Sequence, residues 1–180
     1  MHLTEIMTDR LVLTPLSAVH SPGMFALWSS PEVCQHSGPA ADVHGEPICL
    51  PARTSADSDK ILDFFIACQR RGVAVRWAMT RRDNAAFVGA VGFNRVGACC
   101  ELACHQHPVH WGKGLMTEAC RAAIDWAATN VSAIEFEAFI APANAASVRL
   151  IGRLGFLAAA QLRDGARRYV LARRAAQQLL

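Results

Sequence analysis

The chain has 180 residues, of which 52% are apolar and 18% charged, and its net charge is +3. This length allows a sizeable core, the composition excludes an intrinsically disordered chain, and the small, scattered cationic excess gives no support for nucleic-acid binding. Since no apolar run is long enough for a membrane span and the N-terminus lacks a signal-peptide pattern, we expect one cytoplasmic domain over residues 1–180.

The first third of the chain predicts a strand, a helix and a long loop. "RLVLTPL" (residues 10–16) alternates apolar and polar residues, which is typical of a strand. Ser17 is the expected cap of a helix whose apolar face carries Met24 and Trp28. Residues 29–53 are rich in Pro, Gly, Ser and His, which predicts a long segment at the surface.

A second helix and three strands are expected next. Residues 55–72 begin with acids, carry apolar residues at helical spacing and end with two arginines before a glycine, which predicts a helix. Residues 73–96 predict a hairpin around the turn "RDNA", and "ACCELACHQ" (residues 98–106) predicts a third strand beside it. Pro108 ends that strand because proline cannot donate to a sheet ladder.

The stretch "HWGKGLMTEACRAAIDWA" (residues 110–127) predicts a helix that begins directly after two glycines. Its apolar residues recur at helical spacing and are expected to be buried. Glu118, Arg121 and Asp125 are expected on its solvent face.

The last elements are a strand, a short helix and a hairpin. "AIEFEAFIA" (residues 133–141) predicts the strand, and residues 144–156 predict the helix, with Asn144 as its N-cap and Gly155 just past its end. Residues 156–174 predict a hairpin that turns at the dipeptide "DG". The expected fold class is α/β: a mixed, mostly antiparallel, twisted sheet of about six to seven strands with helices on both faces.

Seven cysteines are unevenly spaced along the chain and most lie in apolar surroundings, which is typical of small buried side chains in a reducing compartment. The stretch "CCELACHQHPVH" (residues 99–110) holds six potential metal ligands but no CxxC or HxxxH pair. Cys99 and Cys100 would also point to opposite faces of a strand. We therefore expect no metal, and a metal-binding protein that uses this strand remains an alternative.

Two glycines bracket Lys113 where a helix must begin, although glycine is a poor helix former. The first N–H groups of a helix lack intrahelical partners, so a bare glycine loop at this point is a place for a phosphate. A plain tight turn is the alternative. The pattern GxxxxGK[ST] fails because Gly114 follows Lys113, and GxGxxG fails because Thr117 replaces its third glycine.

Four stretches of the sequence resemble one family, the GNAT superfamily of acyl-CoA-dependent N-acetyltransferases, and more narrowly its RimJ/RimL branch. They are "TDRLVLTPL", "SSPEV", "CELACHQHPVHWGKGLMTEA" and "APANAASVRLIGRLGF", in the family's order and spacing. The resemblance covers nearly the whole chain. It implies the GNAT fold and a single acetyl-CoA-dependent acyltransferase domain.

The resemblance also implies residues that bind coenzyme A. The family's loop pattern falls on Trp111, Gly114 and Met116, so the pyrophosphate is expected at backbone N–H groups of the loop and the helix start. The pantetheine arm is expected at Asn144, with Ser147 three positions on. The expected coenzyme A residues are Gln106, Trp111, Gly112, Lys113, Gly114, Leu115, Met116, Thr117, Asn144 and Ser147.

Acyl transfer from a thioester needs a neutral amine, a stabilised oxyanion and a proton for the departing thiolate. The resemblance implies that the strand before the loop separates from its neighbour and that backbone N–H groups polarise the acetyl carbonyl in the gap, and Gln106 is our candidate donor. Glu101 is the first candidate base, directly or through water, with a structural ion pair as the alternative. The Ser147 hydroxyl is the candidate proton donor to the sulfur, with helix packing as the alternative.

Other polar residues on these strands are weaker candidates for a role in catalysis. Glu137, on the facing strand, is the second candidate base. His105 and His107 are candidates for proton transfer, because the ordinary pKa of histidine lies near neutral pH, and they are expected on the same face as Glu101. We expect Cys104 to serve in packing rather than as a covalent nucleophile.

The predicted function is transfer of the acetyl group of acetyl-CoA to a primary amine, either a protein N-terminus or a small molecule, by direct attack in a ternary complex. A general base is more necessary for an alkyl amine, with a pKa of about 10.4, than for an α-amine, with a pKa of about 7.7–8.0. The alternative is a catalytically inactive acyl-CoA-binding or sensing module. We expect a monomer or homodimer that binds neither nucleic acid nor a membrane.

Overall fold

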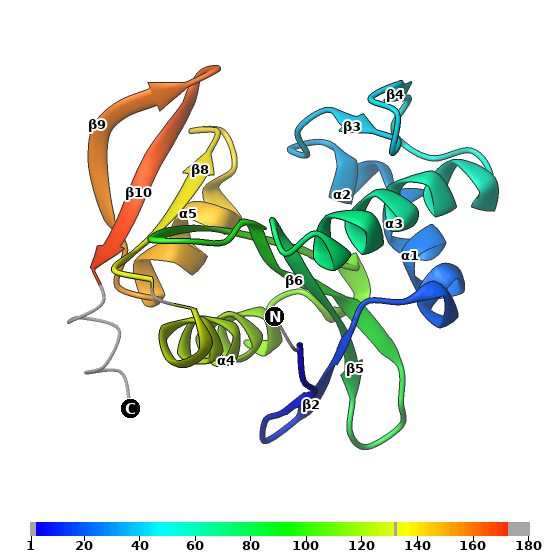
Figure 1. Ribbon diagram of the computed structural model, residues 1–180, viewed down its shortest axis with the longest axis horizontal. Coiled ribbons are helices and arrows are strands. Elements are labelled where there is room, and N and C mark those ends of the chain that lie inside the picture. The colour runs from blue at the N-terminus through cyan, green and yellow to red at the C-terminus, as the bar shows by residue number, and fades with distance from the viewer. Residues whose placement is uncertain (1–2, 132, 173–180) are drawn as a thin grey trace.

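A twisted eight-stranded sheet runs through the computed structural model, which describes residues 3–131 and 133–172 (Figure 1). The strand order is β1-β2-β5-β6-β7-β8-β10-β9, and among these described strands β7 and β8 form the one parallel pair. The strands are β1 (Ile6–Met7), β2 (Leu11–Pro15), β5 (Val75–Arg81), β6 (Phe87–Arg95), β7 (Cys99–Gln106), β8 (Glu135–Ile140), β9 (Leu157–Arg163) and β10 (Ala166–Ala172). The mixed, mostly antiparallel sheet is confirmed, and the two-residue β1 makes it one strand larger than expected.

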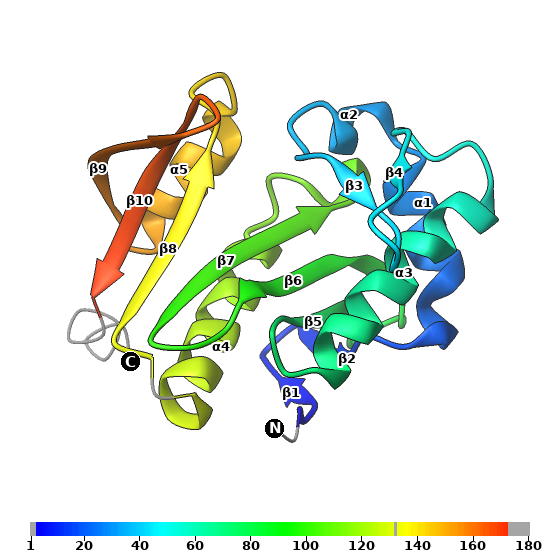
Figure 2. The ribbon, with the colours of Figure 1, turned by 45° about the horizontal axis from the view of Figure 1, so that its top comes forward.

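Helices cover both faces of this sheet. They are α1 (Ser21–Trp28), α2 (Pro31–Cys34), α3 (Ser55–Arg70), α4 (Leu115–Asn130) and α5 (Ala145–Arg153). α1 and α3 pack together over β6 and β5, whereas α4 lies on the opposite face, against β2, β6 and β7, with α5 beside it (Figures 1 and 2). Over the described ranges, none of these helices has both the length and the apolarity that crossing a membrane requires.

The alternation of side chains along β5 shows how the sheet divides the core. Val75, Trp77 and Met79 belong to the larger apolar cluster under α4 and α5, whereas Ala78 belongs to the smaller cluster under α1 and α3. Trp77 meets Trp126 of α4 edge to face, with the ring centroids 4.9 Å apart. Full burial of a large apolar side chain contributes roughly 1.5–3 kcal/mol to stability.

Several predicted element ends are confirmed. The Asn144 side chain caps α5 by accepting the Ser147 N–H at 3.0 Å, and Gly155 follows that helix with a φ of +82°. Asp164 and Gly165 both have positive φ in the turn between β9 and β10. Residues 173 and 174 of the predicted hairpin lie outside the described residues.

Three predictions differ from the structure. Ser17 caps the 3-10 turn Ala18–His20, and His20 is the N-cap of α1. Residues 29–53 contain α2 and a small hairpin, β3 (Ala40–Ala41) with β4 (Pro47–Ile48), because Val33 and Ala52 of this segment are buried against α1 and α3. Glu118 is not on the solvent face of α4. Its side chain is only 17% exposed because it is bonded to the turn between β1 and β2.

Candidate active site

β7 and β8 pair over three residues and then separate (Figure 2). The parallel register runs from Cys99 beside Glu135 to Glu101 beside Glu137. Beyond Glu101, β7 continues to Gln106 paired with β6, and β8 continues paired with β10. The backbone of residues 102–106 therefore has no partner in β8. The family resemblance implies such a separation between the strand before the loop and its neighbour.

The backbone of Gln106 faces this opening. The His107 N–H donates to the Val88 carbonyl at 2.9 Å, and a Cβ on Gly89 would lie 2.2 Å from the His105 carbonyl oxygen. The backbone polar groups of residues 105 and 107 therefore point toward β6. Since successive residues of a strand direct their backbone polar groups to opposite sides, the N–H and C=O of Gln106 point away from β6. Its carbonyl accepts the indole N–H of Trp111 at 2.8 Å, and its N–H has no acceptor among the described residues.

The turn before α4 presents backbone N–H groups that lack protein partners. Gly112 and Gly114 have φ values of +74° and +75°, a conformation that favours glycine. Among the described residues, no acceptor takes the N–H of Gly112, Lys113 or Gly114. The first turn of α4 adds N–H groups without intrahelical partners, so residues 112–117 together form a potential anion-binding site.

The side chains at the start of α4 leave this backbone accessible. Leu115 and Met116 are 1% and 7% exposed and belong to the core, so the bulk of Met116 points away from the loop. Thr117 is half-buried, and Lys113 donates from Nζ to the Val109 carbonyl at 2.9 Å. The loop therefore offers a ligand chiefly its backbone.

Asn144 and Ser147 lie at the first turn of α5, directly after β8. Asn144 Oδ1 is used in the cap, whereas its Nδ2 and the Ser147 hydroxyl have no partner in the part of the chain that the structure describes. Both residues are half-buried. Each therefore keeps one polar group for a ligand.

The Glu101 carboxylate is already engaged on the face that also carries α1 and α3. Arg163, at the end of β9, donates to both of its oxygens at 2.9 Å, and Asn94 donates to Oε1 at 2.9 Å. Asn94 in turn accepts a hydrogen bond from the buried Arg76. Burial raises the pKa of Glu101, but the hydrogen bonds from Arg163 and Asn94 outweigh it, so the pKa lies below its ordinary value.

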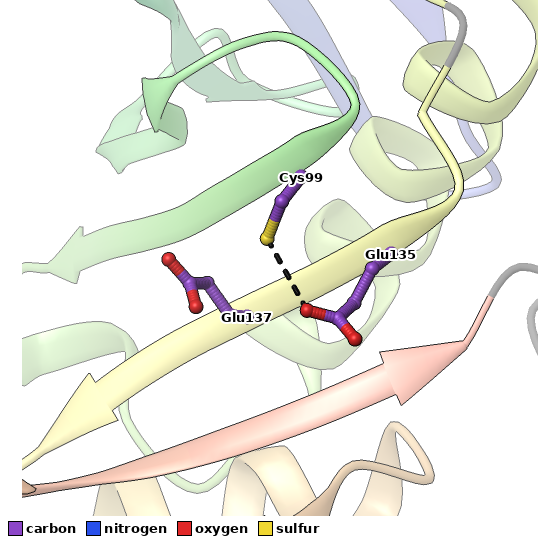
Figure 3. A group of neighbouring side chains, drawn as sticks. All are labelled: Cys99, Glu135 and Glu137. Atoms are coloured by element: carbon purple, nitrogen blue, oxygen red, sulfur yellow. Dashed lines mark hydrogen bonds between the residues drawn. The ribbon is translucent and has the colours of Figure 1, made fainter. Parts of the chain in front are cut away.

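Glu137 is engaged in the same way, because its two oxygens accept hydrogen bonds from Arg95 and Arg168. Figure 3 shows Glu137 and Glu135 near Cys99, whose thiol donates to Glu135 at 3.5 Å. Burial, followed by the charges of the two glutamates, raises the pKa of Cys99 to about 11, and Arg168 also binds Glu135. A protonated thiol beside two guanidinium-bound carboxylates is a poor set of metal ligands.

His105 also has little capacity as a base. Its ring lies 4.6 Å from that of Trp28 in α1. Burial, and then the positive charge of Arg76, lower the pKa of His105 to about 3, so its imidazole is neutral at physiological pH. His107 precedes the turn Pro108–His110, and Cys104 packs against the larger core cluster as expected.

Sequence reasoning missed the arginines that bind these carboxylates. Arg163 is 62 residues from Glu101 along the chain, and Arg95 is 42 residues from Glu137. No motif links residues at such separations. Strand order alone brings them together.

The comparisons with known proteins agree with this geometry. A family model described as "Acetyltransferase (GNAT) domain" matches residues 10–157. The uncharacterized N-acetyltransferase p20 of Bacillus licheniformis is 25% identical over 165 residues, which cover 90% of this chain and 87% of p20.

Solved acetyltransferase structures share the fold. RimL, a ribosomal L7/L12 alpha-N-protein acetyltransferase in complex with coenzyme A, has a TM-score of 0.76 at 17% identity and covers 94% of this chain and 98% of its own. The spermidine/spermine N-acetyltransferase SpeG from Vibrio cholerae has a TM-score of 0.72 at 15% identity, with coverages of 96% and 99%. The family match spans β2, the opening between β7 and β8 and the glycine loop, and the chain therefore belongs to the GNAT acetyltransferase family.

Proposed function

We propose that this GNAT acetyltransferase transfers the acetyl group of acetyl-CoA to the α-amino group of its acceptor, by direct attack in a ternary complex. Family membership supports the acetyl donor and the reaction class. The choice of an α-amine rests on one observation: both candidate bases, Glu101 and Glu137, are bound to arginines. The proposal treats residues 1–180 as one domain, acting as a monomer or homodimer.

The proposed path of acetyl-CoA follows the free backbone and side-chain donors. The pyrophosphate would lie on the N–H groups of residues 112–117, and the pantetheine arm beside Asn144. The thioester would then reach the opening between β7 and β8. There the Gln106 N–H would donate to the acetyl carbonyl and stabilise the oxyanion of the tetrahedral intermediate.

The chemistry then needs two proton transfers. The amine nitrogen forms a bond to the carbonyl carbon, the carbon–sulfur bond breaks, and the nitrogen loses a proton, directly or through water, to Glu101. In this proposal the Ser147 hydroxyl protonates the departing thiolate and is reprotonated by solvent water, to which Glu101 returns the proton taken from the amine. Because the lowered pKa makes Glu101 a weak base, the amine must be neutral before it attacks.

This requirement separates acceptor classes. At pH 7.5, a much larger fraction of an α-amine than of an alkyl amine is neutral, and the two fractions differ by about two orders of magnitude. We expect kcat/KM to be higher by a similar factor for a peptide with a free N-terminus than for the same peptide with a blocked N-terminus and one lysine. Release of free thiol from acetyl-CoA measures both rates, with spermidine as a third acceptor. Equal or faster use of lysine or spermidine would contradict the α-amine assignment.

Asn144 offers a second test, because its cap and its proposed ligand contact use different atoms. Asn144→Ala should lower the free energy of unfolding by about 1 kcal/mol through the lost cap and should raise the KM for acetyl-CoA. Asn144→Asp keeps the capping oxygen but removes the amide donor, so it should preserve the melting temperature and still raise that KM. An aspartate variant with an unaltered KM would reduce Asn144 to a helix cap.

A further inference from the structure

We propose that Arg10 is a positioning residue for coenzyme A, because it fixes the peptide between Lys113 and Gly114 so that the Gly114 N–H faces the pyrophosphate. This inference rests on the proposed function, in which the glycine loop binds coenzyme A. It adds Arg10, which lies 103 residues before Lys113 in the sequence, in the turn between β1 and β2.

Arg10 binds the loop and the helix behind it at the same time. Its Nη1 donates to the Lys113 carbonyl at 2.9 Å, and its Nε donates to Glu118 Oε2 at 2.7 Å. The backbone N–H of Arg10 also donates to Glu118 Oε1, at 2.8 Å. A Cβ built on Gly114 would lie 3.5 Å from Arg10 Nη2, so the guanidinium lies directly against the loop.

These contacts determine where the Gly114 N–H points. In a trans peptide the C=O and the following N–H point in opposite directions. Since the Lys113 carbonyl faces Arg10, the Gly114 N–H faces away from Arg10, and it has no acceptor among the described residues. A loop with glycine on both sides of Lys113 reorients its peptides at low cost, so it needs an external contact to hold one orientation.

Glu118 keeps Arg10 in this position. Its Oε1 also accepts the Thr8 hydroxyl at 2.6 Å. Burial raises the pKa of Glu118, but the hydrogen bonds from Thr8 and Arg10 outweigh it and hold the pKa below its ordinary value, so the carboxylate is ionised at neutral pH. Because Glu118 balances the charge of Arg10, the contribution of Arg10 is preorganisation of the loop rather than direct attraction of phosphate.

Titration calorimetry with coenzyme A tests the inference in the full chain. Arg10→Ala should weaken binding about tenfold and raise the KM for acetyl-CoA, whereas kcat at saturating acetyl-CoA should stay within about twofold of the wild type. Arg10→Lys keeps the charge but has a single side-chain nitrogen in place of the planar guanidinium, so it cannot reproduce the simultaneous contacts with Lys113 and Glu118 and should restore only a small part of the affinity.

Arg82 provides the matched control. Its side chain donates to the Thr8 and Asp9 carbonyls at 2.9 and 3.1 Å, in the same turn, and forms no hydrogen bond to the loop among the described residues. Arg82→Ala should lower the melting temperature about as much as Arg10→Ala while leaving the affinity for coenzyme A unchanged.

The possible outcomes separate this inference from the function on which it rests. Normal affinity in folded Arg10→Ala, or full rescue by Arg10→Lys, would overturn the positioning role. An equal loss of affinity in Arg82→Ala would also overturn it, because the stability of the turn would then explain both variants. If the wild-type protein itself does not bind coenzyme A, the proposed function is wrong.

Discussion

Replacing Gly114 by glutamate should weaken acetyl-CoA binding by roughly tenfold to a thousandfold, which corresponds to about 1.4 kcal/mol for each factor of ten. The new carboxylate would stand beside the N–H groups that we assign to the pyrophosphate and would repel it. The Cβ of the glutamate would lie 3.5 Å from Arg10 Nη2. Its carboxylate could therefore bind Arg10 and compete with the Lys113 carbonyl for that arginine. Titration calorimetry with acetyl-CoA measures the loss.

Two further variants separate charge from backbone strain. Gly114→Ala introduces only the left-handed strain at a φ of +75°, so its loss of affinity should be smaller. Gly72→Glu places the same side chain at a φ of +70° with no atom within 4 Å of its Cβ, in the turn after α3, and should leave acetyl-CoA binding unchanged. Unchanged affinity in Gly114→Glu would contradict the assignment of a phosphate to this loop.

Local signals made most of the fold predictable from the sequence. The alternating residues of β2, the acidic start and basic end of α3, and the cap Asn144 each depend on neighbours only a few residues away. The glycine turn before α4 was recognisable for the same reason, since the two positive φ values that favour glycine lie within one short stretch. Family resemblance then supplied the GNAT fold and the separation of the strand before the loop from its neighbour, which periodicity alone does not determine.

Contacts between distant segments could not be predicted in this way. Periodicity placed Glu118 on the solvent face of α4, but Arg10, 108 residues earlier in the chain, covers it. An ion pair was one of the two interpretations of Glu101, but the sequence did not identify its partner, because Arg163 follows only after β8 and α5. A charged residue on a strand carries no local sign of a partner that lies far away in the sequence, so the direction of its pKa shift could not be inferred.

Replacing Glu101 by glutamine should lower the free energy of unfolding by about 2–3 kcal/mol at neutral pH. Glu101 is 8% exposed and accepts three hydrogen bonds, from Arg163 and Asn94. Removing one partner of a buried ion pair typically costs about 3–5 kcal/mol, and the half-exposed Arg163 reduces this cost because its guanidinium can turn toward water. Denaturant unfolding of the two proteins measures the difference.

The loss of unfolding free energy caused by Glu101→Gln should become smaller as the pH falls into the acid range. Since the folded-state pKa of Glu101 lies below its ordinary value, the stabilisation is fully present above the unfolded pKa of about 4.3 and is lost as the pH falls through the folded value. The stability difference between the wild type and the variant should therefore be constant from about pH 6 to 8 and shrink below about pH 4.3. A difference that grew toward acid pH would contradict the lowered pKa.

Arg163→Met then separates the structural role of Glu101 from its role in proton transfer. This variant keeps the carboxylate and removes the main hydrogen bonds that lower its pKa, so burial should raise the pKa and make Glu101 a stronger base. The ratio of kcat/KM for spermidine to that for an α-amine peptide should therefore increase at pH 7.5. Arg167→Met removes the same charge from an exposed position on the neighbouring strand, which forms no hydrogen bond to Glu101, and should leave the ratio unchanged. If both variants leave the ratio at its wild-type value, Arg163 does not limit the basicity of Glu101, and the preference for α-amines must arise from the shape of the acceptor site instead.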